Sequence, residues 1–511
     1  MSIIIRTVPR YHLLVVLAFL SGLGTGSLPP AWAASSPESG PADASPSAPA
    51  LRIAVQDASA IGGPAESHGA TWVARASAHP TPMGVSVERI PFGHLYEREL
   101  AALNGSAPPF DVIFYAPAWA GDFAPYLQEV PSWVAEDESF DDIHPTFRDR
   151  LMKWDGRWLS VTVDGDLFSG YYRRDLFEDP DNRREFAARY GFELMPPTTW
   201  KQYRAIAEFF TGRPGPDGTP LYGTAEAFAR GGQQFWTAFA RAAAYTNPPG
   251  QTGAQFFDPD TMKPEVNNPG WVRAISDYVD ILRFCPPDAV HYGIAESRKA
   301  FIEGRTALTL DWGDTGPMAE NTALSRIVDK VGYFVLPGAS EVWNSRTRAW
   351  ETVPHGRRVP FLAFGGWVAA VPRNAPHPQE AWHYIMWFSS VANSLADVLD
   401  GSTGVNPYRY SHFSEIDAWT RVFSRRAAAD YLGVIKSSLD SPNVALDLRL
   451  PGFNEYTEAF EEQMSGVLAG TVAVQPALDA VAQAWDAITE RRGRDSQRAL
   501  YRASMGLPPR P

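Results

Sequence analysis

The stretch FLAFGGWVAAVPRNAPHPQEAWHYIMWFSSVANSLADVLDGSTGVNPYRY, residues 361–410, decides how this chain folds. Residues 365–371 are apolar and enter at a glycine pair, which predicts a buried strand. The proline-rich residues 372–378 must end that strand, because proline cannot donate to a sheet ladder. Residues 381–388 then carry apolar side chains at helical spacing, and the Gly- and Pro-rich residues 401–407 read as a connector. A strand, a covering helix and a crossover make one half of an α/β lobe.

The N-terminal part repeats this arrangement. Alternating residues 51–55 and 85–90 predict two strands, and residues 110–115 predict a third. A Gly-rich loop at 61–64 follows the first strand, and a helix at 96–103 precedes the third. Strands that alternate with helices indicate a parallel sheet with helical crossovers.

The remaining elements follow the same logic. Thr199 and Gln202 form a capping box, which predicts that a helix begins there. The polar residues from Arg491 onward are expected to fray. Further expected elements are strands at 158–163 and 307–310, a helix at 233–245, a crossing strand at 331–338, and two last helices marked by Tyr456, Phe460 and Val467 and by Leu478, Val481, Trp485 and Ile488, the first ended by Gly470.

The first 50 residues predict export. A basic start with Arg6 and Arg10 precedes an apolar run, and Ala31-Trp32-Ala33 fits a signal-peptidase site. We therefore expect residues 1–33 to be a secretory signal cleaved near Ala33. Residues 34–50 are rich in Pro, Ala and Ser and are expected to form a disordered linker. No cysteine lies near the cleavage site, which argues against a lipid anchor.

Composition narrows the class of protein. The chain that remains after cleavage is too long for one core and suits two lobes. Its net charge is −13 before cleavage and no basic run appears, so nucleic acid is not an expected partner. The lone Cys285 cannot form an intrachain disulfide and reads as a core residue. The 17 Trp and 19 Tyr residues are unusual for an exported chain, and several fall where strands are expected to end.

Several motifs carry a resemblance to a known family. They are the strand GGWVAAV at 365–371 with its AW helix and GVNP, together with PFDV at 109–112, YYRRDLF at 171–177 and PPTTW at 196–200. In this order the motifs resemble family 1 extracellular solute-binding proteins, the maltose-binding-protein-like components of ABC importers. The resemblance covers Leu51 to Arg492.

The resemblance implies a fold and a division into lobes. The implied fold is α/β, a two-lobed type II periplasmic binding protein in which each lobe is a mainly parallel sheet flanked by helices. Ligand would close the lobes by hinge motion at crossings near 164–170, 335–340 and 401–408. The expected parts are residues 51–164 with 337–402 as the first lobe, 165–336 with 403–495 as the second, and 496–511 as a C-terminal tail.

The candidate site follows from the sheet topology. In open α/β sheets ligands bind outside the carboxyl ends of the strands, and two facing lobes would line a cleft with these loops. A sugar packs its C–H faces on aromatic rings, and carboxylates accept its hydroxyls in charge-assisted hydrogen bonds. The residues selected in this way are Gln56, Asp57, Trp119, Asp164, Asp166, Trp312, Asp314, Trp367, Asn406 and Tyr408.

Asp164 and Asp166 are open to three interpretations. Two residues apart at a strand end, they point the same way and suit ligand binding. They could instead serve the turn itself. A glycosidase pair is the third interpretation, although glycosidase carboxylates flank the bond from opposite sides.

The resemblance adds roles for single residues. It implies a sugar-contacting carboxylate at Asp166, a stacking platform at Trp312 and a further aromatic contact at Trp236, with Gln234 beside it. Tyr456 corresponds to a late family aromatic, but core packing explains it equally well. Trp367 stands where the family has a small residue, so a narrow cleft and a small ligand, a monosaccharide or polyol, are expected.

Other chemistries lack their motifs. The sequence has no Walker-type phosphate loop, no HExxH and no GxSxG, and the polar residues 258–268 do not fit an EF-hand. We expect no metal, no cofactor and no catalysis, and a monomer that delivers a sugar or polyol to the transmembrane subunits of an ABC permease. A secreted carbohydrate-active hydrolase, using Asp164 with Asp166 or Asp311 with Asp314, is the alternative. A binding protein that serves a sensor or a periplasmic enzyme is another.

Overall fold

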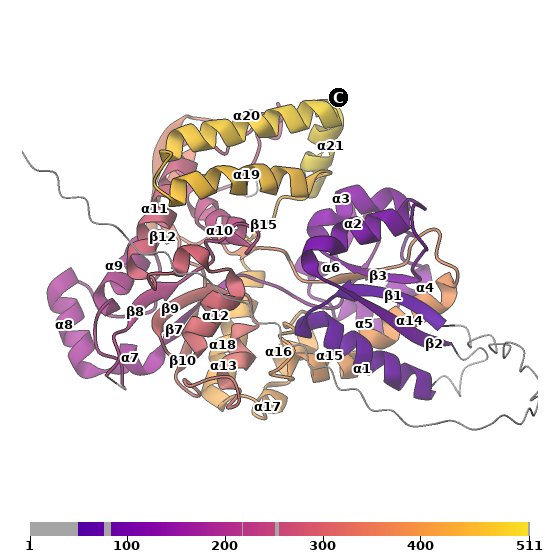
Figure 1. The fold of residues 1–511 in the computed structure, drawn as a ribbon, viewed down its shortest axis with the longest axis horizontal. Helices are drawn as coiled ribbons and strands as arrows, with labels where there is room; N and C mark the ends of the chain where they lie inside the picture. The colour runs from indigo at the N-terminus through magenta and orange to yellow at the C-terminus, as the bar shows by residue number, and fades with distance from the viewer. Residues whose placement is uncertain (1–49, 76–82, 217, 251–254, 509–511) are drawn as a thin grey trace, which may run out of the picture. The chain divides into compact units, whose positions relative to one another are not determined.

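The computed structural model describes residues 50–508, apart from 76–82, 217 and 251–254 (Figure 1). The expected signal at 1–33 and nearly all of the expected linker at 34–50 lie outside these residues. Within the described part, no helix is both long and apolar enough to cross a membrane.

The first sheet contains the three N-terminal strands. Its order is β2-β1-β3-β14-β6, with β1 parallel to β2 and β3, as predicted. β14 runs antiparallel to both of its neighbours, so the sheet is mixed. The strands are β1 (Ala50–Gln56), β2 (Gly84–Ile90), β3 (Val112–Tyr115), β6 (Val161–Thr162) and β14 (Val368–Ala370).

The second sheet has the order β10-β7-β9-β8. β7 is antiparallel to β10 and β9, whereas β8 is parallel to β9. The described residues thus contain two sheets of four or more strands, as the two-lobed prediction requires, and the residue boundaries of the lobes stay a prediction. The strands are β7 (Ser169–Arg173), β8 (Tyr222–Ala225), β9 (Thr306–Asp311) and β10 (Val331–Phe334).

Helices cover both sheets, and α1 and α2 lie on opposite faces of the first one (Figure 1). Before β7 come α1 (Ser59–Arg75), α2 (Phe92–Leu103), α3 (Ala120–Phe123), α4 (Ser132–Ala135), α5 (Glu138–Asp141) and α6 (Pro145–Arg148). Between β7 and β10 come α7 (Arg174–Glu178), α8 (Pro180–Tyr190), α9 (Trp200–Phe210), α10 (Gln234–Thr246), α11 (Pro269–Ile281), α12 (Ile294–Ile302) and α13 (Thr315–Glu320). After β14 come α14 (Pro378–Phe388), α15 (Val391–Val398), α16 (Tyr410–Ser414), α17 (Ile416–Trp419), α18 (Arg425–Leu439), α19 (Phe453–Leu468), α20 (Val474–Arg492) and α21 (Arg494–Ser504).

Three short strand pairs complete the structure. They are β4 (Lys153–Trp154) with β5 (Arg157–Trp158), β11 (Ala339–Asn344) with β12 (Ala349–Arg357), and β13 (Phe361–Leu362) with β15 (Ala445–Leu446). The β11–β12 hairpin was expected in the first lobe. In the structure the hairpin packs against α10 and α11.

Several local predictions are confirmed. Thr199 and Gln202 form the capping box at the start of α9, with Gln202 N–H donating to Thr199 Oγ1 over 3.2 Å. α19 ends at Leu468, Ala469 is its C-cap, and the next residue, Gly470, has a left-handed φ of +70°. Cys285 is buried and has a free thiol.

The glycine-rich residues 61–64 form no loop but lie inside α1. A Cβ at Gly62 would lie 2.9 Å from Gln56 O and 2.9 Å from Arg89 Nε. The glycine therefore lets the helix approach β1 and β2, and it does not mark a turn.

The two strands expected at 158–163 and 365–371 are shorter than predicted. The first is divided between β5 and β6. The second begins only at Val368, because Gly365 and Gly366 have φ values of +84° and +85°, outside the strand region.

The polar C-terminus does not fray as expected. α20 continues to Arg492, and residues 494–504 form α21. Tyr501 is buried from α21, where its ring packs at 5.6 Å from that of Phe257. Gln497 and Arg502 are buried with Tyr501, so three side chains dock a helix that composition alone marks as a tail.

Gly366 offers a test of this backbone. A Cβ there would lie 2.0 Å from Asp164 O, and its φ of +85° already disfavours alanine. We expect Gly366→Ala to lower the free energy of unfolding by at least about 2 kcal/mol in denaturant titration. Gly63→Ala is the matched control: it lies in α1 with open space around it and should stabilise by roughly 0.5–1 kcal/mol. Equal stability of the two variants would contradict this account.

Candidate functional site

A cavity of about 240 Å³ lies where loops of both sheets meet. β1 contributes Gln56, and the loop after β6 contributes Asp164 and Asp166. The loop after β9 contributes Trp312 and Asp314. The other lining residues are Ala58, Ala60, Phe92, Gln233, Ile294, Ala295, Arg298, Phe364, Trp367 and Thr403. Among the residues selected because they lie at strand ends, six line this cavity together: Gln56, Asp164, Asp166, Trp312, Asp314 and Trp367.

Asn406 connects the three aspartates. Its backbone N–H donates to Asp164 Oδ1 over 2.7 Å. Its side-chain amide donates to Asp166 Oδ1 and, over 2.9 Å, to Asp314 Oδ1. Asn406 is itself buried and lies behind the cavity wall, so it positions carboxylates that line the cavity.

Gly165, between the first two aspartates, permits this arrangement. A Cβ on Gly165 would lie 2.6 Å from Pro407 O and 2.6 Å from Tyr408 Cβ. A larger residue would therefore push the 406–408 backbone away from Asp164 and break its hydrogen bond.

Arg298, on α12, is the cation of the cavity wall. Its guanidinium donates to both oxygens of Asp311, over 2.6 and 2.9 Å, and lies 2.8 Å from Asp314 Oδ2. Thr315 Oγ1 also donates to Asp311, over 2.5 Å. This ion pair holds the Trp312–Asp314 loop on α12, but it leaves Asp164 and Asp166 with amide donors alone.

Burial raises the pKa values of Asp164 and Asp166. For Asp164 the pKa rises to about 8, first through burial and then through the charge of Asp314. For Asp166 the pKa also lies well above its ordinary value, through burial and the neighbouring charges of Asp164 and Asp314. Part of this cluster is therefore protonated at neutral pH.

A second cavity of about 330 Å³ adjoins the first. The two share Phe92, Gln233 and Phe364. Trp119 and Trp236 line the second cavity and not the first. The remaining lining residues are Gly93, Tyr96, Glu97, Ala116, Gly231, Phe235, Phe453, Asn454, Thr457, Glu458 and Glu461.

Polar contacts fix the indole rings at this boundary. Trp119 Nε1 donates to Asn454 Oδ1 over 3.1 Å, and Trp236 Nε1 donates to Asp447 Oδ2 over 2.5 Å. Trp312 Nε1 donates to Ala363 O over 2.9 Å, and the Trp312 ring meets the Trp236 ring edge-on at 5.3 Å. The rings are therefore held rigidly before any ligand arrives.

Two of the residues shared by both cavities have left-handed backbone. Gln233 has a φ of +73° and Phe364 a φ of +63°, which is rare for an aromatic residue. Such strain concentrates at functional sites. The sequence analysis did not select Phe364, which precedes the strand expected at residues 365–371.

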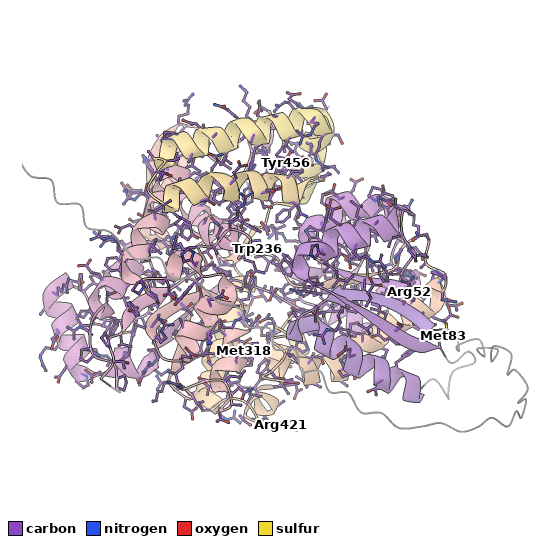
Figure 2. All side chains as sticks on the ribbon, viewed as in Figure 1. Arg52, Met83, Trp236, Met318, Arg421 and Tyr456 are labelled. Atoms are coloured by element: carbon purple, nitrogen blue, oxygen red, sulfur yellow. The ribbon has the colours of Figure 1, made fainter. Side chains whose placement is uncertain are left out.

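Other predicted residues lie in the core. Tyr408 is 0% exposed and packs edge-on against His412 at 5.0 Å, so it does not line the cavity. Tyr456 is also 0% exposed: its hydroxyl lies 3.0 Å from Thr489 Oγ1 and its ring 5.4 Å from that of Trp485. Figure 2 places Tyr456 at α19 and Trp236 at α10. Tyr456 is therefore a core residue, and this corrects the expectation that it lines the cleft.

Gln234 is likewise buried without lining either cavity, whereas its neighbour Gln233 lines both. The residue that faces the cavities is therefore Gln233, which immediately precedes α10, and not Gln234, the first residue of the helix. The sequence analysis also missed Arg298 and Phe92. No motif marks Arg298, and Phe92 is the first residue of α2, after the turn that follows β2.

Known proteins resemble this one at the level of family and fold. Residues 83–394, more than half of the chain, match the family described as bacterial extracellular solute-binding protein. The chain belongs to this family. No curated protein matches this solute-binding protein significantly over its sequence.

Solved structures of solute-binding proteins match nearly the whole fold. One is an ABC transporter solute-binding protein from Agrobacterium radiobacter K84 in complex with ribitol, at 22% identity and a TM-score of 0.65, covering 86% of this chain and 98% of that one. Another is from Agrobacterium vitis S4 with bound D-mannitol, at 19% identity and a TM-score of 0.65, covering 87% and 99%. Maltose-bound MalE3 of T. maritima follows at 18% identity and a TM-score of 0.64, covering 86% and 99%. The fold is that of the type II periplasmic binding proteins.

The residues that the structure describes include no group of three or more His, Cys, Asp or Glu side chains arranged to hold a metal ion. The carboxylates of the site are held by hydrogen bonds from Asn406 and by the ion pair with Arg298.

The raised pKa of Asp164 makes stability depend on pH. A carboxyl that holds its proton more tightly when folded contributes stability that is lost as pH rises from the ordinary pKa of 3.8 through about 8. We expect the free energy of unfolding of the wild type to fall between about pH 5 and about pH 9 by at least about 1 kcal/mol more than that of Asp164→Asn. Exposed Asp495→Asn should keep the wild-type pH dependence. A wild type and an Asp164→Asn variant with parallel pH curves would contradict the assignment.

Proposed function

We propose that this protein is the periplasmic substrate-binding component of an ABC importer and captures a sugar or polyol. The observation that carries the proposal is the 240 Å³ cavity, where Asp164, Asp166 and Asp314 face a site walled by Trp312 and Trp367. Hydroxyl groups donate to the carboxylates and C–H faces pack on the rings. The solved structures with ribitol and D-mannitol share this fold and support the ligand class.

The size of the cavity supports a small ligand. Pockets for drug-sized molecules run from about 300 to 1,000 Å³, so a cavity of about 240 Å³ suits one sugar ring or a short polyol. Trp367 forms part of the wall, in keeping with the expected narrowing.

Ligand capture is proposed to close the two lobes. The cavity draws Gln56 from the first sheet and Trp312 from the second, so a ligand that touches both stabilises the closed arrangement. It shifts the population only by its differential affinity for that state. The closed protein would then dock on the transmembrane permease. Export through cleavage near Ala33 is part of the same proposal.

The cavity is proposed to bind without catalysis. Asn406 donates to both Asp164 and Asp166, which leaves both carboxylates on one side of the cavity. A glycosidase needs an acid and a base on opposite sides of the scissile bond, at least about 5 Å apart. Incubation with aryl glycosides should release no product.

A thermal-shift screen of the exported chain against monosaccharides and polyols tests the proposal. A ligand at 100 times its dissociation constant adds about 2.7 kcal/mol to the free energy of unfolding. We expect such a ligand to be found, and we expect Trp312→Ala to weaken its binding at least about tenfold, because the variant removes a wall of the cavity.

Tyr456→Phe is the control for that experiment. It removes a hydroxyl bonded to Thr489 in the core and leaves the cavity unchanged, so it should lower stability and retain affinity. Release of product from a glycoside, or the absence of any sugar or polyol ligand, would contradict the proposed function.

A further inference from the structure

The two cavities share Phe92, Gln233 and Phe364, and their lining has an unusual charge balance. Six carboxylates line them, and Arg298 is the one cationic side chain among the lining residues. Glu97 and Glu458 are exposed and hydrated, so they count for little. The acids that remain are the buried Asp164, Asp166 and Glu461 and the half-buried Asp314.

Arg298 cannot balance these buried acids. Its guanidinium is already engaged by both oxygens of Asp311 and by Asp314 Oδ2. Asn406 donates hydrogen bonds to Asp164 and Asp166, but both of its donors are neutral amide groups that carry no positive charge. Burial raises the pKa values of Asp164 and Asp166 because their charged forms lack a cationic partner, and an arriving positive charge would favour those charged forms.

An unpartnered acceptor points the same way, independently of the aspartates. Glu461 is only 7% exposed and lines the second cavity. Its Oε2 accepts from Gly231 N–H over 3.0 Å, whereas its Oε1 has no partner. Gln233, shared by both cavities, also has a buried Oε1 without a partner. Both oxygens without a partner are hydrogen-bond acceptors, so a ligand bound beside them would be stabilised by donating to them.

The aromatic walls also suit a cation. Phe235, Trp119 and Trp236 line the second cavity together with Glu461, and Phe92 and Phe364 line both cavities. The faces of such rings attract ammonium groups. Carboxylates beside aromatic faces thus provide two kinds of attraction for one positive charge.

We propose that the ligand carries an ammonium group, so that it is an amino sugar or an amino polyol rather than a neutral one. The ammonium donates to the open acceptors, and its charge balances the buried acids. The hydroxyl groups occupy the first cavity as the proposed function describes, and this inference rests on that function.

Matched ligands separate charge from shape. Isothermal titration of the exported chain would compare D-glucosamine, D-glucose and N-acetyl-D-glucosamine, and would compare 1-amino-1-deoxy-sorbitol with sorbitol. A charge-assisted hydrogen bond is stronger than a neutral one, so we expect an amine to bind at least about tenfold tighter than its neutral partners. The preference should decrease as salt is added.

Variants locate the charge that matters. Asp166→Asn and Glu461→Gln each keep the shape of the side chain, and at least one should reduce the amine preference to about threefold or less. Glu462→Gln is the matched control, because Glu462 follows Glu461 in α19 but is exposed. It should leave the preference unchanged.

Three results would overturn this inference in distinguishable ways. Neutral sugars or polyols that bind as tightly as their amines would refute the charge requirement and leave the proposed function standing. An amine preference that survives in both variants would refute the assignment to these carboxylates. If neither amines nor neutral sugars and polyols bind, the proposed function fails together with the inference.

Discussion

The hydrogen bonds of Asn406 are the constraint on which the site depends. One residue of a Gly- and Pro-rich connector reaches Asp164 with its backbone and Asp166 and Asp314 with its side chain. Asp164 and Asp166 follow the first sheet, whereas Asp314 follows a strand of the second. A single amide thus ties both sheets and the returning chain to one point. Its contacts hold like charges together that would otherwise repel.

The chain stabilises this cluster without providing enough positive charge. Arg298 secures Asp311 and Asp314, and burial raises the pKa values of Asp164 and Asp166 so that protons remain. Rigid indole rings and the strained backbone of Phe364 complete the walls. Local stability is thereby given up for a preorganised surface of acceptors and rings, which is what a binding protein for hydroxylated ligands requires.

The sequence predicted features that have a local cause. Alternation predicted β1 and β2, residues 110–115 predicted β3, the capping box predicted the start of α9, and strand ends selected Asp164, Asp166, Trp312 and Trp367. Features that depend on distant contacts were missed. Gly62 lies in α1, where its missing side chain lets the helix approach Gln56 and Arg89, and Arg298 acquires its role only when Asp311 folds against it. Tyr456 shows the limit, since an aromatic at helical spacing looks the same in a cleft and in a core.

A crystal structure with the tightest-binding sugar, polyol or amine tests the central claim most directly. The account predicts ligand density in the 240 Å³ cavity, with a donor of the ligand within hydrogen-bond distance of Asp166 and its carbon face against Trp312. Asn406 should keep its bonds to all three aspartates. Ligand density elsewhere on the molecule, with this cavity holding only solvent, would contradict the account.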